Sequence, residues 1–414
     1  MGYLGLEKDK KYMELALEIA FKQLGKTSPN PPVGAVIVKN DNIVSTGGTS
    51  LYGQDHAEIV AIRNAGTDLE GSEIYVSLEP CSHYGKTPPC TEAIIQSKIS
   101  KVYIPLLDPN PIVAGKGVAR LQEVGVEIVV MKEMAFKAYE LIRHFKKYIL
   151  KNRAYVLQKN AISLDGKIAT LAGDSKWISS DYSRFIVHKL RSIVDAVVIG
   201  KNTLIQDNPT LNIRFDSFSE EVKRYINNIK DASFLNKSFF LEMLLNLEEN
   251  EDQNSPLRVI VGLPERIDTD QKIFFDNNFI FFSDEKVKEH LIKREDYTIV
   301  SRLINNGQIQ FIKGDTRYEQ VSNIVGNLSE QGKIFIMLEG GGVLSGSFLS
   351  AGEIDQFLYF ISPKIIGEGI SPITGSGVKT VQGSMDLYDI SAVKIKDDIL
   401  YNAYKCPFNN NSRE

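Results

Sequence analysis

The sequence lacks long hydrophobic runs, a secretory leader and a set of paired cysteines. No window approaches the roughly 18 consecutive apolar residues of a membrane-spanning helix. Residues 1–12 are charged and polar and contain no hydrophobic signal region. Three cysteines do not make a disulfide framework. We therefore expect a cytoplasmic protein without a membrane span, because free thiols survive in that reducing compartment.

Charge and length set two further limits. The formal net charge is −4, which gives no reason to expect a general nucleic-acid-binding surface. The 414 residues, 43% of them hydrophobic, can form at least two ordinary cores. The composition therefore predicts a globular chain with at least two domains.

One histidine and two of the three cysteines fall in a single stretch. Its motifs are HAE at 56–58, EPC at 79–81 and PPC at 88–90. The imidazole of His56 and the thiolates of Cys81 and Cys90 suit a tetrahedral Zn²⁺ whose fourth position is left open for water. Glu58 could then move protons to and from that water without binding the metal. This arrangement is typical of zinc deaminases, in which Zn²⁺ makes a hydroxide and a glutamate carries protons.

Two simpler interpretations compete with a catalytic zinc. The ligand types could fall together by chance, or they could hold a structural zinc ion. A structural site normally has a fourth cysteine or histidine nearby. The only candidate is His83, which lies inside the loop between the two cysteines, where simultaneous ligation is awkward. A catalytic zinc therefore explains these residues best.

Alternating helix and strand patterns predict a layered α/β domain with a central sheet over residues 1–150. A proline-rich loop with Asn30 precedes the first strand, and Asn30 is equally suited to a turn cap or a substrate contact. Both thiolates are expected near helix N-terminal donors, which lower thiol pKa values. The expected helices are 10–24, 56–64, 90–96, 117–124 and 133–150, and the expected strands are 33–38, 43–46, 73–78, 101–106 and 126–130.

A second α/β domain is expected over residues 151–414. A serine-rich cluster at 179–181 predicts the N-cap of a helix over 182–191. Residues 216–256 hold nine acidic and four basic side chains and read as an insertion with helices near 220–230 and 237–247. Two interpretations of this insertion have equal weight: it forms a subunit contact, or it is a mobile acidic excursion. The expected strands are 154–159, 195–199, 257–261, 279–282, 333–338 and 354–361.

Three consecutive glycines between a strand and a helix suggest a phosphate site in the second domain. The turn is EGGG at 339–342, and the helix that follows adds N–H donors and a partial positive charge. Arg191 and Arg214 offer cations of the type that binds phosphate through a bidentate fork. The residue types therefore predict a large phosphorylated ligand, most simply a dinucleotide. The single tryptophan, Trp177, could stack on a planar ring, but composition favours a place in the core.

Taken together, these motifs resemble the bifunctional riboflavin-biosynthesis deaminase/reductase family. The resemblance covers residues 10–405 in the family's order. The most specific feature is the loop of eight residues between Cys81 and Cys90, where many zinc deaminases have only two. The matching segments are PNPPVGA at 29–35, HAE at 56–58, EPCSHYGKTPPC at 79–90, DPNP at 108–111, KNAISLDG at 159–166, DNP at 207–209 and EGGG at 339–342.

The resemblance implies a cytidine-deaminase-like N-terminal domain and a dihydrofolate-reductase-like C-terminal domain. The first would use Zn²⁺ to deaminate a phosphoribosyl pyrimidine, with Glu58 as the catalytic residue, and the second would use NADPH to convert its ribosyl chain to ribityl. By position, the deaminase substrate would contact Asn30, Lys86, Asp108 and Asn110. NADPH would contact Ala161, Trp177, Thr203, Asp207, Gly341, Gly342, Val343, Leu344, Ser345, Gly346 and Ser347. The reductase substrate would contact Lys159, Ser175, Arg191, Leu211, Arg214 and Glu339.

Two features depart from the family pattern, and two other functions compete. Thr49 stands where the family commonly has a histidine, which predicts a raised KM for deamination or the use of another residue. The insertion after Arg214 is also longer than the family leads us to expect. The competing functions are a nucleic-acid editing deaminase, which the acidic net charge disfavours, and an active deaminase with a non-catalytic reductase-like domain. We expect a small-molecule enzyme that forms a homo-oligomer through its reductase domain.

Overall fold

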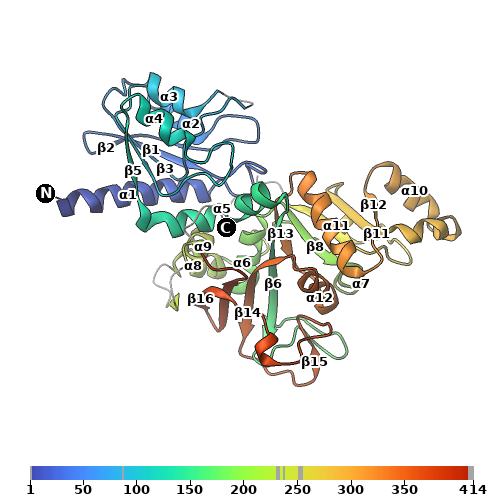
Figure 1. Ribbon diagram of the computed structural model, residues 1–414. Coiled ribbons are helices and arrows are strands. Elements are labelled where there is room, and N and C mark those ends of the chain that lie inside the picture. Colours follow the sequence, from blue (N-terminus) through green and yellow to red (C-terminus); the bar gives the residue numbers. More distant parts are fainter. Residues whose placement is uncertain (1, 86–87, 230–233, 236–237, 250–254, 409–414) are drawn as a thin grey trace. The chain divides into compact units, whose positions relative to one another are not determined.

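A computed structural model describes residues 2–85, 88–229, 234–235, 238–249 and 255–408, and these form two compact units (Figure 1). The first unit contains the described residues up to 152, together with 238–243 and 408. The second contains the described residues of 153–235 and 244–407. No helix among the described residues is long and apolar enough to cross a membrane.

The first unit is built on one five-stranded sheet with the order β2-β1-β3-β4-β5. β1 and β2 form an antiparallel hairpin, whereas β3, β4 and β5 run parallel. The strands are β1 (Gly34–Lys39), β2 (Asn42–Gly48), β3 (Glu73–Val76), β4 (Lys101–Ile104) and β5 (Glu127–Val130). The helices are α1 (Gly2–Phe21), α2 (Ala57–Asn64), α3 (Cys90–Gln96), α4 (Lys116–Glu123) and α5 (Ala135–Lys151).

Two glycines allow helices to pack closely on opposite faces of the β1–β2 hairpin. A Cβ atom on Gly34 would lie 2.0 Å from the carbonyl oxygen of Ala16 in α1. A Cβ atom on Gly47 would lie 2.3 Å from the carbonyl oxygen of Ala57 in α2. Gly34 pairs with Gly48, so Gly34 and Gly47 point to opposite faces of the pleated sheet. The layered α/β architecture expected for this part of the chain is therefore confirmed.

The first helix differs in its bounds from the expected 10–24. It already includes residues 2–9 and ends at Phe21. Glu7, Lys8, Lys10 and Lys11 are exposed on its outer face, so their charge does not interrupt the helix. The chain then leaves the helix through a turn in which Gly25 has a φ of 76°.

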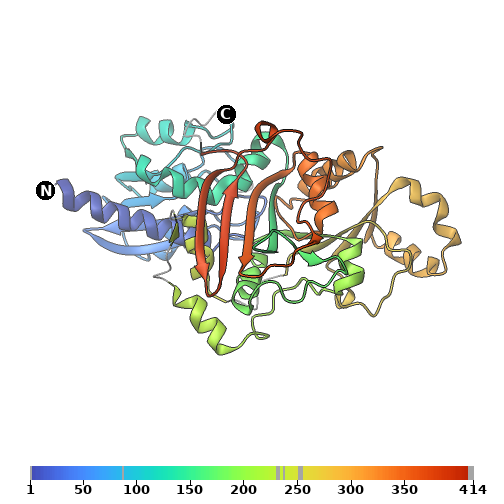
Figure 2. The same cartoon turned by 90° about the horizontal axis from the view of Figure 1, so that it is seen from below.

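The second unit contains a ten-stranded sheet with the order β12-β11-β10-β8-β13-β6-β14-β17-β16-β9. The strands from β12 to β14 are parallel, and β17, β16 and β9 continue the sheet in antiparallel fashion. Figure 2 shows β14, β17 and β16 side by side in orange and red. The ten strands are β6 (Tyr155–Ser163), β8 (Ala196–Gly200), β9 (Phe234–Leu235), β10 (Leu257–Val261), β11 (Phe279–Asp284), β12 (Ile309–Ile312), β13 (Phe335–Leu338), β14 (Ile354–Ser362), β16 (Tyr388–Ile395) and β17 (Asp398–Tyr404).

Helices cover this sheet, and a small sheet joins β7 (Ala169–Thr170) to β15 (Gly369–Ile370). Buried aliphatic residues of β6, β8, β10 and β13 pack against α11 and α12 to form the core. The helices are α6 (Asp181–Arg191), α7 (Lys201–Asp207), α8 (Glu220–Asn227), α9 (Phe239–Asn246), α10 (Tyr297–Asn305), α11 (Arg317–Glu330) and α12 (Gly342–Ser350). Sequence patterns had not predicted α7, α10, α11, β12, β16 or β17.

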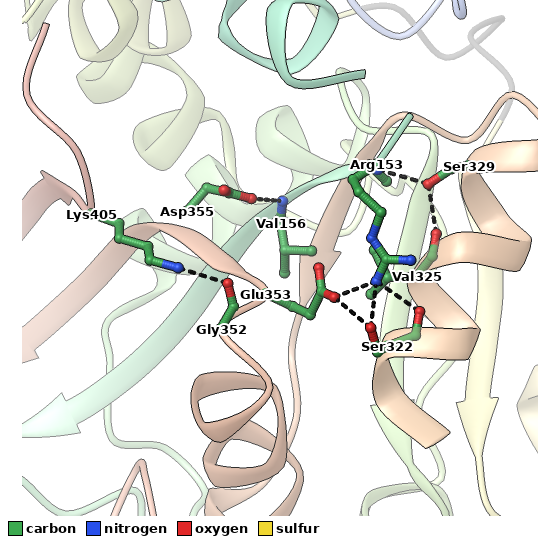
Figure 3. Close-up of polar contacts among 10 residues, drawn as sticks. Arg153, Val156, Ser322, Val325, Ser329, Gly352, Glu353, Asp355 and Lys405 are labelled. Carbon is green, nitrogen blue, oxygen red and sulfur yellow. Dashed lines mark hydrogen bonds and ion pairs between the residues drawn. The ribbon is translucent and has the colours of Figure 1, made fainter. Parts of the chain in front are cut away.

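Side chains from α11 and from Glu353, the residue before β14, hold the beginning of β6 (Figure 3). Arg153 donates to the hydroxyl and carbonyl oxygens of Ser322 and forms an ion pair with Glu353. The Ala154 N–H donates to the Ser329 hydroxyl at 2.7 Å, and that hydroxyl donates to the Val325 carbonyl at 2.6 Å. These bonds satisfy polar groups that would otherwise be buried without partners at the start of a central strand.

The insertion contributes two helices, α8 and α9, near the expected positions. Lys189 of α6 is fully buried beneath them and donates to the Asn227 side chain at 2.9 Å and to the Leu245 carbonyl at 2.8 Å. Within the first unit, the Glu140 carboxylate accepts hydrogen bonds from the Ser238 hydroxyl and the Phe239 N–H, both at 2.9 Å. The described part of the insertion therefore forms two helices whose residues pack against buried side chains.

Ser329→Ala should destabilise the second unit by about 1–2 kcal/mol, because the buried Ala154 N–H loses its acceptor. Urea unfolding can be followed through Trp177, the only tryptophan, which lies in this unit. Ser384→Ala is the matched control, because Ser384 is exposed and, within the part of the chain that the structure describes, its hydroxyl donates only to the neighbouring Val381 carbonyl. Equal stability of the two variants would contradict the anchoring role of Ser329.

The Lys189 ammonium should make stability depend on pH. Burial lowers its pKa from 10.5 to about 8. Between about pH 8 and 10.5 the folded state loses this proton before the unfolded state does, so the free energy of unfolding rises with pH across this window. The stability gained in this way is fully present above about pH 10.5 and is lost as pH falls through about 8. Relative to Lys189→Met, the wild type should gain about 1–2 kcal/mol between pH 7 and pH 9.5. A constant difference in unfolding free energy at the two pH values would contradict this.

Candidate active sites

His56, Cys81 and Cys90 meet in the first unit at the ends of three different segments. His56 is the N-cap of α2, Cys81 follows β3, and Cys90 is the first residue of α3. The Nδ1 atom of His56 lies 3.5 Å from the Cys81 sulfur and 3.3 Å from the Cys90 sulfur. Ligands bound to one tetrahedral zinc through ordinary Zn–N and Zn–S bonds would lie about 3.6 Å apart. The three donors therefore fit Zn²⁺.

The ligand set leaves room for a fourth, exchangeable position. Among the described residues, only these three form a group of metal-ligating side chains whose donor atoms lie within 4.8 Å of one another. His83 is not a member of the group, so the geometry gives no support to a structural four-ligand site. The arrangement matches a catalytic zinc site with an open position.

The local hydrogen bonds favour a thiolate at Cys81. A hydrogen bond with the Cys90 side chain lowers the pKa of Cys81 to about 4, and the hydrogen bond with Cys81 raises the pKa of His56 to about 9. The Cys90 N–H at the start of α3 also donates to the Cys81 sulfur at 3.4 Å. The expected helix N-terminal donor is confirmed for Cys81, but the expected lowering of both thiol pKa values is wrong for Cys90, because its hydrogen bond with Cys81 and its burial raise the pKa of the Cys90 thiol. Metal binding would displace protons from this cluster.

Glu58 lies in the first turn of α2, directly beside the ligand cluster. Its side chain is buried, and this burial raises its pKa to about 7. A carboxyl group that titrates near neutral pH can both accept and release a proton. Glu58 therefore has the location and the acidity of a general acid–base group.

Glu79 is a residue whose role the sequence motif did not reveal. Its buried carboxylate accepts hydrogen bonds from the N–H groups of Asp108, Gly115 and Val118, at 3.1, 2.9 and 3.1 Å. A Cβ atom on Gly117 would lie 2.0 Å from the Pro80 carbonyl oxygen, so the loop and the motif lie in close contact. Glu79 thus fixes the loop after β4 next to Cys81.

The predicted deaminase substrate residues lie on two loops of the first unit. The Asp108 carboxylate accepts from the Asn110 N–H at 2.8 Å, and the Asn110 side chain accepts from the Ile112 N–H at 3.1 Å. Burial raises the pKa of Asp108 to about 7. Asn30 is half-buried at a turn in which its N–H donates to the Thr27 carbonyl. Lys86 lies outside the described residues.

Thr49 has a structural role in this chain. It is buried, and its hydroxyl bonds to both the N–H and the carbonyl oxygen of Val33, at 3.2 and 3.3 Å. Its own N–H donates to the same carbonyl oxygen. The hydroxyl of Thr49 is therefore committed to the backbone before β1.

The second unit contains a cavity of about 1530 Å³ at the carboxyl ends of its parallel strands. Most residues predicted for NADPH and for the reductase substrate line this one cavity. Ser345 and Gly346 do not, because a Cβ atom on Gly346 would lie 1.6 Å from the Thr374 carbonyl oxygen and Ser345 is fully buried. The predicted residues that line it are Lys159, Ala161, Ser175, Trp177, Arg191, Thr203, Asp207, Leu211, Arg214, Glu339, Gly341, Gly342, Val343, Leu344 and Ser347.

A buried ion pair lies in the floor of this cavity. Arg191 donates to both oxygens of Glu339, at 3.2 and 2.9 Å, and the Lys159 ammonium lies 4.0 Å from the same carboxylate. Burial lowers the pKa of Lys159. Arg191 is therefore engaged with a carboxylate, whereas no ion pair of the Arg214 guanidinium occurs within the described residues. Of the two arginines, Arg214 is the one positioned to meet an anion from outside.

The expectation that Trp177 belongs to the core is wrong. Its side chain is 60% exposed, it lines the cavity, and the Arg184 guanidinium lies 4.2 Å from its ring centre. One face of the indole therefore contacts a cation, and the ring is placed to stack on a planar ligand. Composition alone could not reveal this, because a lone tryptophan carries no periodic pattern.

His188 is another residue that the motifs did not identify. It lies on α6, is almost fully buried and lines the cavity. Its Nδ1 atom accepts a hydrogen bond from the Arg214 N–H at 2.9 Å. Burial lowers the pKa of His188 to about 2, which keeps the imidazole neutral. The ring hydrogen then resides on Nε2.

The fold and the sites define a zinc deaminase joined to a nucleotide-binding reductase, and comparisons with known proteins agree. Residues 6–106 match the cytidine and deoxycytidylate deaminase zinc-binding region, and residues 154–401 match the RibD C-terminal domain. The riboflavin biosynthesis protein RibD of Aquifex aeolicus is 36% identical over 95% of this chain and 98% of its own length. The Escherichia coli protein of the same name is 30% identical over 94% of this chain and 95% of its own.

Solved structures show the same relationship. A Thermotoga maritima diaminohydroxyphosphoribosylaminopyrimidine deaminase/5-amino-6-(5-phosphoribosylamino)uracil reductase superposes with a TM-score of 0.75 at 30% identity, covering 97% of this chain and 99% of that one. Acinetobacter baumannii RibD superposes with a TM-score of 0.74 at 28% identity, covering 96% and 99%.

The chain belongs to the RibD family of bifunctional riboflavin-biosynthesis enzymes. It is a zinc-dependent deaminase and an NADPH-dependent reductase that acts on small molecules. Agreement over nearly the whole chain favours this interpretation over an editing deaminase or an inactive reductase-like domain.

The metal site can be tested with the third cysteine as a control. Wild-type protein should bind about one zinc per chain, and Cys90→Ala should reduce this to less than half an equivalent, because two ligands hold zinc far more weakly than three. Cys406→Ala should keep the wild-type content, because Cys406 is exposed and lies outside the ligand group. The measurement is elemental analysis after dialysis, and similar zinc contents in the two variants would contradict the assignment.

Proposed function

We propose that the chain deaminates diaminohydroxyphosphoribosylaminopyrimidine and then reduces 5-amino-6-(5-phosphoribosylamino)uracil, converting its ribosyl chain to ribityl. The observation that carries the deaminase step is the convergence of His56, Cys81 and Cys90 beside the buried Glu58. The reductase step is supported by the single cavity that gathers the residues expected for both cofactor and substrate. The substrates are those named for the Thermotoga maritima relative.

In the proposed deaminase site, His56, Cys81 and Cys90 hold the metal and Glu58 carries protons. Zinc supplies activation of a water molecule for attack on the ring carbon that bears the amino group. Glu58 takes a proton from that water and delivers it to the departing ammonia. Burial of Glu58 suits both steps, because it brings the proton affinity of the carboxylate closer to neutral pH.

Four residues are proposed to bind the deaminase substrate: Asn30, Lys86, Asp108 and Asn110. The bonds that Asp108 and Asn110 make to their own loop fix one side of each side chain. The second Asp108 oxygen and the Asn110 amino group have no hydrogen-bond partner within the described residues and are left for the pyrimidine and the ribose phosphate.

In the proposed reductase site, the cofactor lies along the carboxyl ends of β6, β13 and β8. NADPH supplies the hydride when bound. Gly341 leaves room for its phosphates to approach the N-terminus of α12, whereas Gly342, the first residue of α12, packs against the Ser371 carbonyl oxygen, from which a Cβ atom would lie 2.2 Å away. Ala161 and Trp177 form the ring-binding end, and Thr203 lies next to the glycine turn. Asp207, Val343, Leu344 and Ser347 complete the proposed cofactor contacts.

The reductase substrate is proposed to lie over the charged floor of the same cavity. Lys159, Arg191 and Glu339 would bind its polar groups, and Arg214 would bind its phosphate. Ser175 and Leu211 complete the proposed wall. Lys159, Arg191 and Arg214 outnumber Glu339, which gives this region the positive charge that a phosphate ester requires.

We further propose that residues 1–150 carry the deaminase and residues 151–414 the reductase, in a cytoplasmic homo-oligomer that does not bind nucleic acid. The net charge of −4 supports the last point. Association through the reductase domain is supported by exposed apolar side chains on the connection after β14, which include Ile365, Val378 and Val381.

Glu58→Gln separates the two proposed activities. The variant should keep its zinc, because Glu58 is not a ligand, and its deaminase turnover should fall by about 10²–10⁴-fold for loss of the proton carrier. NADPH oxidation with the deaminated substrate should remain at the wild-type rate. Ammonia release, NADPH absorbance and zinc content are measured on the same preparation. Retained deamination would overturn the role of Glu58, and loss of both activities would overturn independent domains.

A further inference from the structure

We propose that His188 is a positioning residue for phosphate recognition in the reductase unit: its Nδ1 atom holds the backbone of Arg214, so that the guanidinium faces the cavity. This inference rests on the proposed role of Arg214 in substrate binding. His188 lies outside the residue set that the family resemblance supplied.

The backbone of Arg214 bonds directly to the His188 ring. Arg214 lies where the chain leaves the cavity wall and enters the insertion, five residues before Ser219, which caps α8. Its N–H donates to His188 Nδ1 at 2.9 Å, whereas its guanidinium has no ion pair within the described residues. The backbone of Arg214 is therefore tied to α6 while the side chain stays free for a ligand.

The surroundings of His188 keep it in the form that this bond needs. Its ring packs edge-on against Phe218, with ring centres 5.2 Å apart, and Phe185 packs against both Phe215 and Phe218. Arg191, Arg214 and Lys159 lie close enough to disfavour an added positive charge. A protonated imidazole would present N–H groups at both nitrogens and could not accept the Arg214 N–H.

The next turn of α6 secures the same segment. Arg191 donates to the Asn212 carbonyl at 3.3 Å, two residues before Arg214. Leu211 has a φ of 55° and is buried, so the chain turns sharply into this segment. With both Asn212 and Arg214 bonded to α6, the arginine has little backbone freedom to lose when the phosphate binds.

Three substitutions in the full-length protein test the proposal. His188→Leu removes the acceptor, His188→Asn places a carbonyl oxygen close to the position of Nδ1, and Arg214→Ala removes the guanidinium itself. For each variant, the KM for the phosphorylated substrate, kcat, and the Kd for NADPH are measured. Binding of ribose 5-phosphate by calorimetry provides a readout that does not depend on turnover. Thermal unfolding verifies that each variant is folded.

His188→Leu should raise the substrate KM and the ribose 5-phosphate Kd about tenfold, the effect of one lost positioning bond. The NADPH Kd and kcat should stay within about twofold, and His188→Asn should recover most of the loss. Equal weakening of NADPH and substrate, or no recovery in a folded His188→Asn protein, would overturn the positioning role.

Arg214→Ala separates this inference from the function on which it rests. If Arg214→Ala leaves ribose 5-phosphate binding unchanged, the proposed substrate contact of Arg214 fails, and the inference fails with it. If Arg214→Ala weakens binding but His188→Leu does not, only the role of His188 is wrong. If His188→Leu does not fold, His188→Gln takes its place, because its carbonyl oxygen lies one bond farther out and should miss the Arg214 N–H.

Discussion

Both active sites depend on one constraint: polar groups buried at the ends of strands must find hydrogen-bond partners. In the first unit, the Glu79 carboxylate accepts hydrogen bonds from two N–H groups of the loop after β4 and from one N–H group in the first turn of α4. That loop carries Asp108 and Asn110, and Glu79 stands two residues before Cys81. A single buried side chain therefore sets the position of the loop with Asp108 and Asn110 relative to the metal ligands. The zinc site and the proposed pyrimidine contacts are parts of one hydrogen-bonded assembly.

The second unit satisfies the same constraint with charges. Glu339 follows the last residue of β13 and precedes the glycine turn, and its carboxylate accepts two hydrogen bonds from Arg191. A buried carboxylate costs free energy unless it is paired, so the pair fixes α6 against the end of the sheet. Helix α6 in turn holds the backbone around Arg214 and, through Lys189, both helices of the insertion. The insertion is thus bonded to the same helix that holds the backbone of Arg214 at the cavity wall.

Local sequence patterns predicted the parts of this molecule that have strong hydrophobic periodicity or clear capping and turn residues. The zinc ligands, the start of α3 at Cys90 and the cap of α6 at Ser180 follow from residue type and spacing alone. The roles of Glu79 and His188 could not be predicted in this way, because their partners lie 26 to 39 residues away in the sequence. The prediction that Trp177 lies in the core failed for a related reason, since its exposure depends on a cavity wall built from distant segments. Helices such as α7 were missed because they are short and begin directly at a strand end.

Thr49, at a position where the family resemblance led us to expect a histidine, has a structural role in this chain. A threonine hydroxyl is short enough to reach both the N–H and the carbonyl oxygen of Val33. These bonds fix the proline-rich loop immediately before β1, and that loop carries Asn30. A larger side chain at this buried position would have to point elsewhere. Thr49 therefore contributes to the proposed pyrimidine site indirectly, by holding the segment that carries Asn30.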